Sequence, residues 1–171
     1  MTSLSWDTKP ERVAWSKELL NCIGGTLGML EDGDPEKFIS GYTGLSEDGK
    51  IRYWSELIIA MAKFESNLDP HCVYHEPPPL GVDSIGLLQL SYEDQENYNL
   101  EPLSRTEKSL ENPLINIRCA VIILSTLVSQ DKVIASGSGK TSRGGARYWS
   151  VLREGHHITE IKNLVKQSIG L

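Results

Sequence analysis

Apolar side chains between residues 54 and 64 recur at the spacing of one face of an α-helix. They are Trp54, Leu57, Ile58, Met61 and Phe64. Glu65 lies four residues after Met61 and therefore continues the same stripe. Asn67 and the Asp69-Pro70 pair predict the end of the helix directly afterwards. The pattern thus predicts an apolar helix that ends beside a carboxylate on its buried face.

Helical periodicity also predicts the other elements. These are a helix from Pro10 that ends at Gly24-Gly25, a short helix over 35–39 within a looped connection over 31–50, a polar helix or turn over 91–98, a central apolar helix from Asn112-Pro113 to Val128, a short helix over 146–153 and a last amphipathic helix over 158–166. Alternation of period two, which is typical of strands, is nearly absent. The chain of 171 residues is long enough for one domain with a core. The predicted fold is a mainly α single domain, with an N-terminal helical extension (1–50) packed on a catalytic domain (51–171).

Glu65 is the candidate catalytic residue. A carboxylate on an apolar stripe is costly unless it is paired or protonated. Its place at the C-terminal end of the helix, where the dipole is negative, disfavours ionisation further. Both effects predict a raised pKa, which suits a general acid that works near neutral pH.

Composition narrows the function. The net charge of −6 argues against nucleic-acid binding. No uninterrupted apolar run approaches the roughly 20 residues of a membrane span. Residues 1–7 lack the basic and apolar regions of a signal peptide, so export would require a leader outside this sequence. Of the three cysteines, Cys22 and Cys119 fall in apolar helical stretches, where we expect buried free thiols. One disulfide plus one free thiol, possible among Cys22, Cys72 and Cys119 in an exported protein, remains an alternative.

Three other motifs suggest ligands. They are Asp32, Asp34 and Glu36 for calcium, the group His71, Cys72, His75 and Glu76 for zinc, and Gly139-Lys140-Thr141 for a phosphate loop. The acidic group lacks the ligand order of an EF-hand, and a proline-rich loop does not hold the zinc candidates on one face. The phosphate loop requires glycine where Ile134 stands. We therefore expect no metal or cofactor and interpret residues 135–145 as a mobile surface loop.

Four segments in order resemble the family of goose-type lysozymes and soluble lytic transglycosylases, which cleave peptidoglycan. They are Glu65-Ser66-Asn67-Leu68-Asp69-Pro70, Ser84-Ile85-Gly86-Leu87-Leu88-Gln89, Asn112-Pro113 with Asn116-Ile117, and Ala146-Arg147-Tyr148. The resemblance spans about residues 54–152. Trp149 departs from it, because the family usually has Asn after the Tyr. A proline-rich insertion over 71–80 also lengthens the path from Glu65 to Gln89.

The resemblance implies a lysozyme-like helical fold and peptidoglycan glycan strands as the partner. It implies that Glu65 is the catalytic acid and base, and that Gln89 and Tyr148 contact the glycan or shape the site. Ser84 and Tyr92 are further candidates for substrate binding. One carboxylate suffices for a lytic transglycosylase, which forms 1,6-anhydro-muramic ends.

A hydrolytic muramidase would need a second acid, for which Glu76, Asp83 and Glu93 are candidates. A non-catalytic glycan-binding module and a helical interaction protein are the remaining alternatives. We expect a monomer that acts in the periplasm or outside the cell. We also expect the insertion over 71–80 to overhang the substrate groove and to set the selectivity for the glycan strand.

Overall fold

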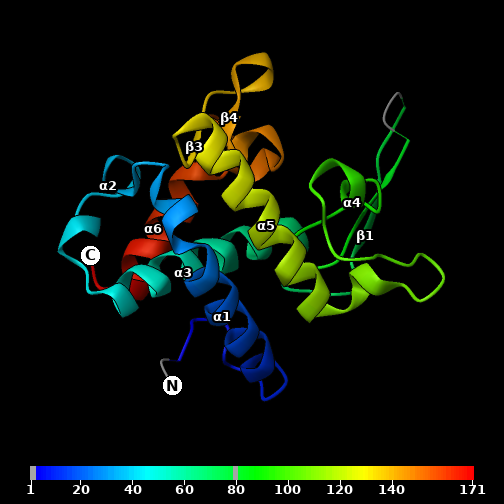
Figure 1. Cartoon of the computed structure of the whole chain (residues 1–171), viewed down its shortest axis with the longest axis horizontal. Helices are drawn as coiled ribbons and strands as arrows, with labels where there is room; N and C mark the ends of the chain where they lie inside the picture. The colour runs from blue at the N-terminus through cyan, green and yellow to red at the C-terminus, as the bar shows by residue number, and fades with distance from the viewer. Residues whose placement is uncertain (1–2, 79–80) are drawn as a thin grey trace.

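The structure of the protein is a computed structural model that describes residues 3–78 and 81–171. Pro79 and Leu80, in the predicted insertion, lie outside the described residues, as do Met1 and Thr2. Six α-helices form within these ranges (Figure 1). They are α1 (Arg12–Glu31), α2 (Pro35–Phe38), α3 (Glu47–Ser66), α4 (Asp94–Asn97), α5 (Pro113–Asp131) and α6 (Ile158–Ile169). The predicted mainly α fold is confirmed.

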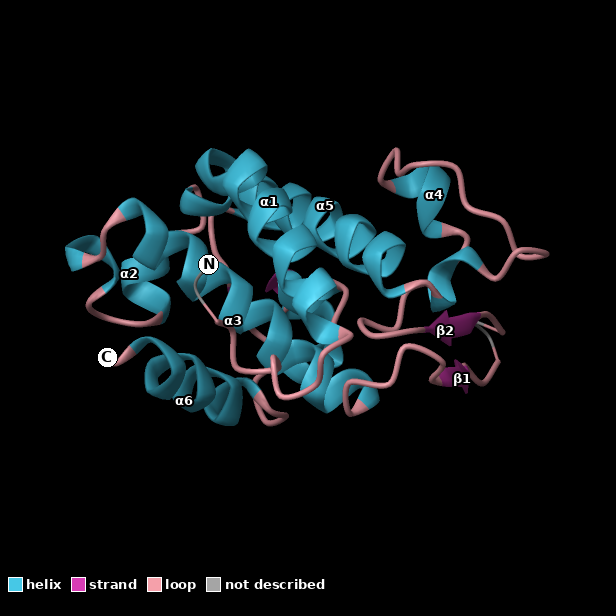
Figure 2. Cartoon of the chain, turned by 90° about the horizontal axis from the view of Figure 1, so that it is seen from below, coloured by secondary structure: helices cyan, strands magenta, loops and turns pink. Residues whose placement is uncertain are grey.

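The remaining regular elements are short. The strands pair as two antiparallel hairpins, β1 (Val73–His75) with β2 (Asp83–Ile85) and β3 (Ala135–Ser136) with β4 (Arg143–Gly144). The 3-10 helices are η1 (Tyr42–Gly44), η2 (Ser109–Glu111), η3 (Gly139–Thr141), η4 (Gly145–Arg147) and η5 (Ser150–Leu152). The β1–β2 hairpin and α4 lie together at one end of the molecule (Figures 1 and 2).

Helix α5 begins where the sequence predicts. The Asn112 side chain accepts a hydrogen bond from the Leu114 backbone N–H at 3.0 Å, and Pro113 occupies the first turn. The helix is apolar almost all round, and Ile117, Ala120 and Leu124 are fully buried. Its length and hydropathy would also suit a membrane span, and 56% of the apolar window is buried inside the protein. Here it serves as the central core helix.

The predicted end of the first helix at Gly24-Gly25 is wrong. Helix α1 continues to Glu31 and packs along α5, beside which it lies in Figure 2. Ile23 and Leu30, on either side of the glycine pair, are both fully buried. Each helical glycine costs about 1 kcal/mol relative to alanine, and burial of two large side chains exceeds that cost.

Helix α3 is longer than predicted at its start. Residues 47–50, which the sequence suggested were part of a loop, form its first turn, and Ser46 Oγ caps it by accepting from the Gly49 N–H at 3.2 Å. Its end agrees with prediction, because Ser66 is the last helical residue and Asn67 follows in the left-handed conformation (φ 53°). Helix α3 therefore presents Glu65 in its last turn.

The C-terminal third differs from prediction in two places. Residues 146–153 form the 3-10 helices η4 and η5, with Trp149 between them, instead of an α-helix. Residues 135–144 form the β3–β4 hairpin with η3 at its tip, so the predicted mobile loop has regular structure. The predicted last helix is confirmed as α6, which buries Ile161 and Val165 on one face and packs on α3.

Candidate functional site

A groove of about 840 Å³ opens between the C-terminal end of α3, the β1–β2 hairpin, α4 and the η4–η5 segment. Its polar lining comes from four carboxylates and one guanidinium, together with hydroxyl and amide groups. The charged residues are Glu65, Glu76, Glu93, Asp94 and Arg153. Ser84, Gln89 and Tyr148 also line it. A groove of this size can take several sugar units of an extended chain.

Glu65 is half-buried at the groove wall, and its Oε1 has no hydrogen-bond partner among residues 3–78 and 81–171. Burial raises its pKa to about 7, and the charge of Glu76 acts in the same direction. The backbone of Val151 and the charge of Arg153 act in the opposite direction. The predicted raised pKa is present, and its main cause is desolvation. Glu65 can therefore be protonated near neutral pH.

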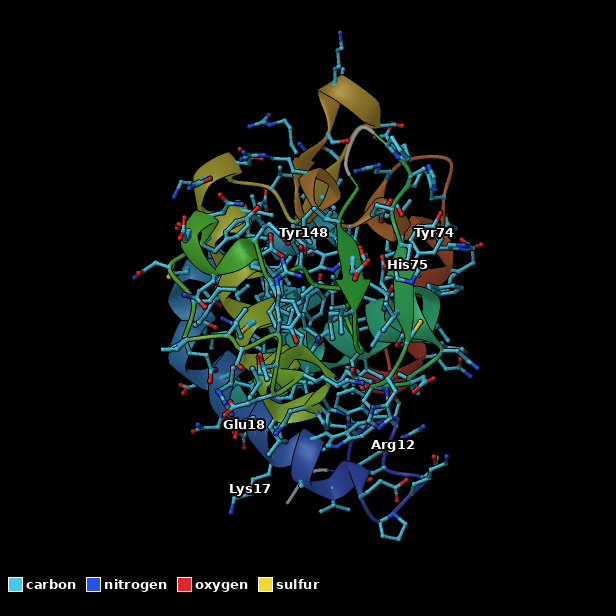
Figure 3. All side chains as sticks on the ribbon, turned by 90° about the vertical axis from the view of Figure 1, so that its right-hand side faces the viewer. Arg12, Lys17, Glu18, Tyr74, His75 and Tyr148 are labelled. Carbon is cyan, nitrogen blue, oxygen red and sulfur yellow. The ribbon has the colours of Figure 1, made fainter. Side chains whose placement is uncertain are left out.

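The β1–β2 hairpin places Glu76 in the groove and Asp83 on its other face. Tyr74 pairs with Ser84 across the hairpin, and Tyr74, Ser84 and Glu76 all line the groove. Ser84 Oγ donates to Glu76 Oε1 at 3.2 Å. Asp83 pairs instead with His75, at 2.6 Å from its Nδ1, on the other side of the strands. Figure 3 labels Tyr74 and His75, which are neighbours on β1, and Tyr148, which comes from the η4–η5 segment.

The turn over residues 85–90 contributes Gln89 to the groove lining and is held by side chains from α3 and α5. From α3, Ser66 Oγ donates to the Leu87 carbonyl at 2.9 Å. From α5, the fully buried Asn116 donates to the Ile85 carbonyl and accepts from the Leu88 N–H. Gly86 is required there, because its φ is 78° and a Cβ would lie 2.4 Å from Asn116 Nδ2.

Gln89 joins this turn to the hairpin. Its Nε2 donates to the Gly86 carbonyl at 2.9 Å and to the Cys72 carbonyl at 3.1 Å, at the base of β1. The side chain is buried, at 8% exposure, although it borders the groove. In this structure its amide donors are therefore hydrogen-bonded to backbone carbonyls. Gln89 thus helps to shape the site, the role that the sequence predicted as an alternative to glycan binding.

The Transglycosylase SLT domain family matches residues 46–136, which hold α3, the hairpin, the turn and α5. The chain belongs to this family. The solved structure of wild-type DslA is 34% identical, with a TM-score of 0.82, and the match covers 98% of this chain and 94% of that one. Two DslA variants, each with glutamine in place of one glutamate, give TM-scores of 0.81 at 34% identity, with 96% and 93% covered. None of the curated proteins compared matches the chain.

Trp149, where the sequence departs from the usual SLT pattern, has a structural role at the same turn. Its indole N–H donates to the Leu88 carbonyl at 2.9 Å, and the side chain is only 1% exposed. A buried tryptophan needs such an acceptor. Sequence reasoning missed this contact because the two residues are 61 positions apart.

Two other candidates, Tyr92 and Glu93, lie away from the centre of the groove. Tyr92 does not line the groove, and its ring lies 4.8 Å from the Arg105 guanidinium carbon in a neighbouring surface hollow. Glu93 lines the groove edge, pairs with Arg105 and accepts from Ser91 Oγ, and the Ser91 bond in particular lowers its pKa. Asp94, which the sequence did not single out, lies in the groove and accepts a hydrogen bond from Tyr148 Oη.

The zinc candidates and the cysteines are dispersed. His71 Nδ1 lies 3.0 Å from Glu111, whereas His75 pairs with Asp83. Within residues 3–78 and 81–171, no three histidine, cysteine or acidic side chains converge as metal ligands do. All three cysteines are free thiols, with Cys119 buried and the other two half-buried.

Proposed function

We propose that Glu65 is the general acid that cleaves the β-1,4 bond between N-acetylmuramic acid and N-acetylglucosamine in peptidoglycan. The supporting observation is the state of this carboxyl, which has a pKa of about 7, faces the groove and carries an unpartnered Oε1 among the described residues. A protonated carboxyl with a free oxygen can deliver a proton to a glycosidic oxygen. SLT membership supports peptidoglycan as the substrate.

The proposed reaction needs one carboxyl in two steps. Glu65 gives its proton to the glycosidic oxygen, and the bond from that oxygen to muramic C1 breaks as positive charge develops on the ring. The C6 hydroxyl of the same sugar then bonds to C1, and ionised Glu65 takes the hydroxyl proton. The product is a 1,6-anhydro-muramic end, and Glu65 is again protonated.

Hydrolysis is the second candidate, and the position of Glu76 favours it. Glu76 faces the same groove and raises the pKa of Glu65 through its charge. The two DslA variants replace glutamates that are eleven positions apart, the spacing that separates Glu65 from Glu76. In this route Glu76 takes a proton from water while the water oxygen bonds to C1. Glu93 and Asp83 fit less well, because at the surface Glu93 pairs with Arg105 and Asp83 is hydrogen-bonded to His75.

Mass spectrometry of fragments released from purified peptidoglycan tests both routes. Anhydro ends, one water lighter than reducing ends, are expected for the wild type, and Glu65→Gln should release about 10³-fold less. Glu76→Gln should leave anhydro products unchanged. Reducing ends that disappear in Glu76→Gln would establish hydrolysis instead. Full activity in a folded Glu65→Gln variant would refute the assignment of Glu65, and binding without any fragments would indicate a non-catalytic module.

We further propose that the protein acts as a monomer on the cell wall, in the periplasm or outside the cell. The large apolar side chains that are exposed among the described residues lie on α1, on β1 and at Leu171 instead of on one face. Light scattering after gel filtration should give the monomer mass of about 19 kDa. Cell fractionation with an antibody tests the location, and recovery in the cytoplasmic fraction alone would contradict it.

A further inference from the structure

Asp94 is a buried carboxylate of the groove that the proposed reaction does not use. It is the first residue of α4 and is 6% exposed. Burial raises its pKa, while hydrogen bonds from Tyr148 and Ser91 act against that rise. A carboxylate removed from water is retained at low cost only when donors satisfy it. Its donors therefore indicate what Asp94 does.

Both donors reach the same oxygen of Asp94. The Ser91 backbone N–H donates to Oδ2 at 2.8 Å, and Tyr148 Oη donates to Oδ2 as well. The first bond closes the turn before α4. The second spans 54 positions of sequence and joins α4 to the η4–η5 segment, both of which line the groove. Asp94 thus holds the only proton of the Tyr148 hydroxyl.

The ring of Tyr148 is held in place by aromatic neighbours. Tyr98 meets it edge-on at 6.2 Å between centroids, and Trp149 is tilted against it at 4.6 Å. Burial and the charge of Asp94 both raise the pKa of Tyr148, so its hydroxyl stays protonated. With the ring fixed and the proton committed to Asp94, the Tyr148 oxygen can meet any further group only as an acceptor, and the Ser91 backbone beside it already acts on it as a donor that lowers its pKa.

We propose that Asp94 is a positioning residue that sets the hydrogen-bond polarity of Tyr148, so that Tyr148 Oη meets the glycan only as an acceptor. This inference rests on the proposed glycan-binding function. Tyr148 would then select a sugar group that carries an N–H or O–H donor, such as the N–H of an acetamido group. A sugar that lacked such a donor at this position would leave the Tyr148 oxygen unpaired and would bind more weakly.

Binding to a hexamer of N-acetylglucosamine, measured by calorimetry in the Glu65→Gln background, tests the inference. Tyr148→Phe and Asp94→Ala should each weaken binding about five- to tenfold. The double variant should be no weaker than either single variant, because both remove one interaction. Asp94→Asn should stay within about twofold, since its amide oxygen can accept from both donors. An Asp94→Ala effect that is absent, or that multiplies with Tyr148→Phe, would overturn the inference.

A second measurement does not depend on Asp94→Ala being folded. The Tyr148 hydroxyl proton, held by a buried carboxylate, should give a slowly exchanging downfield NMR signal that persists when the hexamer binds. Assignment uses its loss in Tyr148→Phe. Loss of the signal on binding would mean that the proton turns to the ligand, which contradicts the inference. If neither the hexamer nor purified peptidoglycan binds to any variant, the proposed function itself fails. If the wild type binds and both single variants bind as well as the wild type, only this inference fails.

Discussion

Replacement of Asn116 by alanine should destabilise the protein strongly. Asn116 is fully buried and makes three hydrogen bonds to backbone groups: it donates to the Ile85 and Leu110 carbonyls at 2.9 and 3.0 Å and accepts from the Leu88 N–H at 3.0 Å. Each buried group left unpaired costs about 1–3 kcal/mol. Partial relaxation of the turn should recover some of that, so we expect a loss of about 3–5 kcal/mol in the free energy of unfolding.

Asn112→Ala is the matched control, because it removes an asparagine from the same end of α5. Its cap bond to the Leu114 N–H is exposed, so its loss should cost about 1 kcal/mol. Urea unfolding followed by circular dichroism, with equal slopes for both variants, gives the two values. If Asn116→Ala costs no more than Asn112→Ala, the three buried bonds do not hold the turn.

Three further predictions concern Glu65, Trp149 and the N-terminal extension. The pKa of Glu65 rises from 4.5 to about 7 on folding, so its ionisation destabilises the folded protein as pH rises through this window. Glu65→Gln should therefore be more stable than wild type by about 1–3 kcal/mol at pH 8, with no difference at pH 4. Parallel urea titrations at the two pH values measure this difference. Trp149→Phe should lower stability by about 1–2 kcal/mol and reduce fragment release, because the Leu88 carbonyl loses its indole donor; unchanged melting temperature and turnover would contradict this. We propose that residues 1–50 fold with the rest of the chain. A 51–171 fragment loses the packing of α1 on α5 and also the cap and first turn of α3, so it should show no cooperative thermal transition. A sharp transition would make residues 1–50 dispensable.

The elements that the sequence predicted well are those in which local signals and burial agree. Asn112-Pro113 begins α5 because the cap, the proline and the apolar stripe all favour the same start. Glu65 could be singled out because a carboxylate on an apolar stripe is rare and costly. The start of α3 was also readable in principle, since Ser46 precedes two acids in the manner of a helix cap.

The features that could not be predicted depend on contacts between distant residues. Helix α1 passes through Gly24-Gly25 because α5 covers its apolar face, and that packing is invisible in the local sequence. Asp94 reads as an ordinary acid in a polar turn until Tyr148, 54 positions later, is seen to donate to it. Residues 145–152 likewise form 3-10 helices instead of an α-helix, and Trp149 between them donates to the distant Leu88 carbonyl.

The turn over 85–90 connects the segments that carry Glu65 and Glu76, the two carboxylates that distinguish the proposed reactions. Ser66, next to Glu65 on α3, is bonded to the turn, and so is the base of the hairpin that carries Glu76, through Gln89 and the Cys72 carbonyl. The Gly86 N–H adds a second bond to the same carbonyl at 2.8 Å. These bonds fix the backbone of α3 at Ser66 and the base of the hairpin relative to each other, so we expect the turn to influence the distance between the two carboxyls. Because that distance separates hydrolysis from a reaction with one carboxyl, a change in the turn should alter the ratio of anhydro to reducing ends even where total cleavage is preserved.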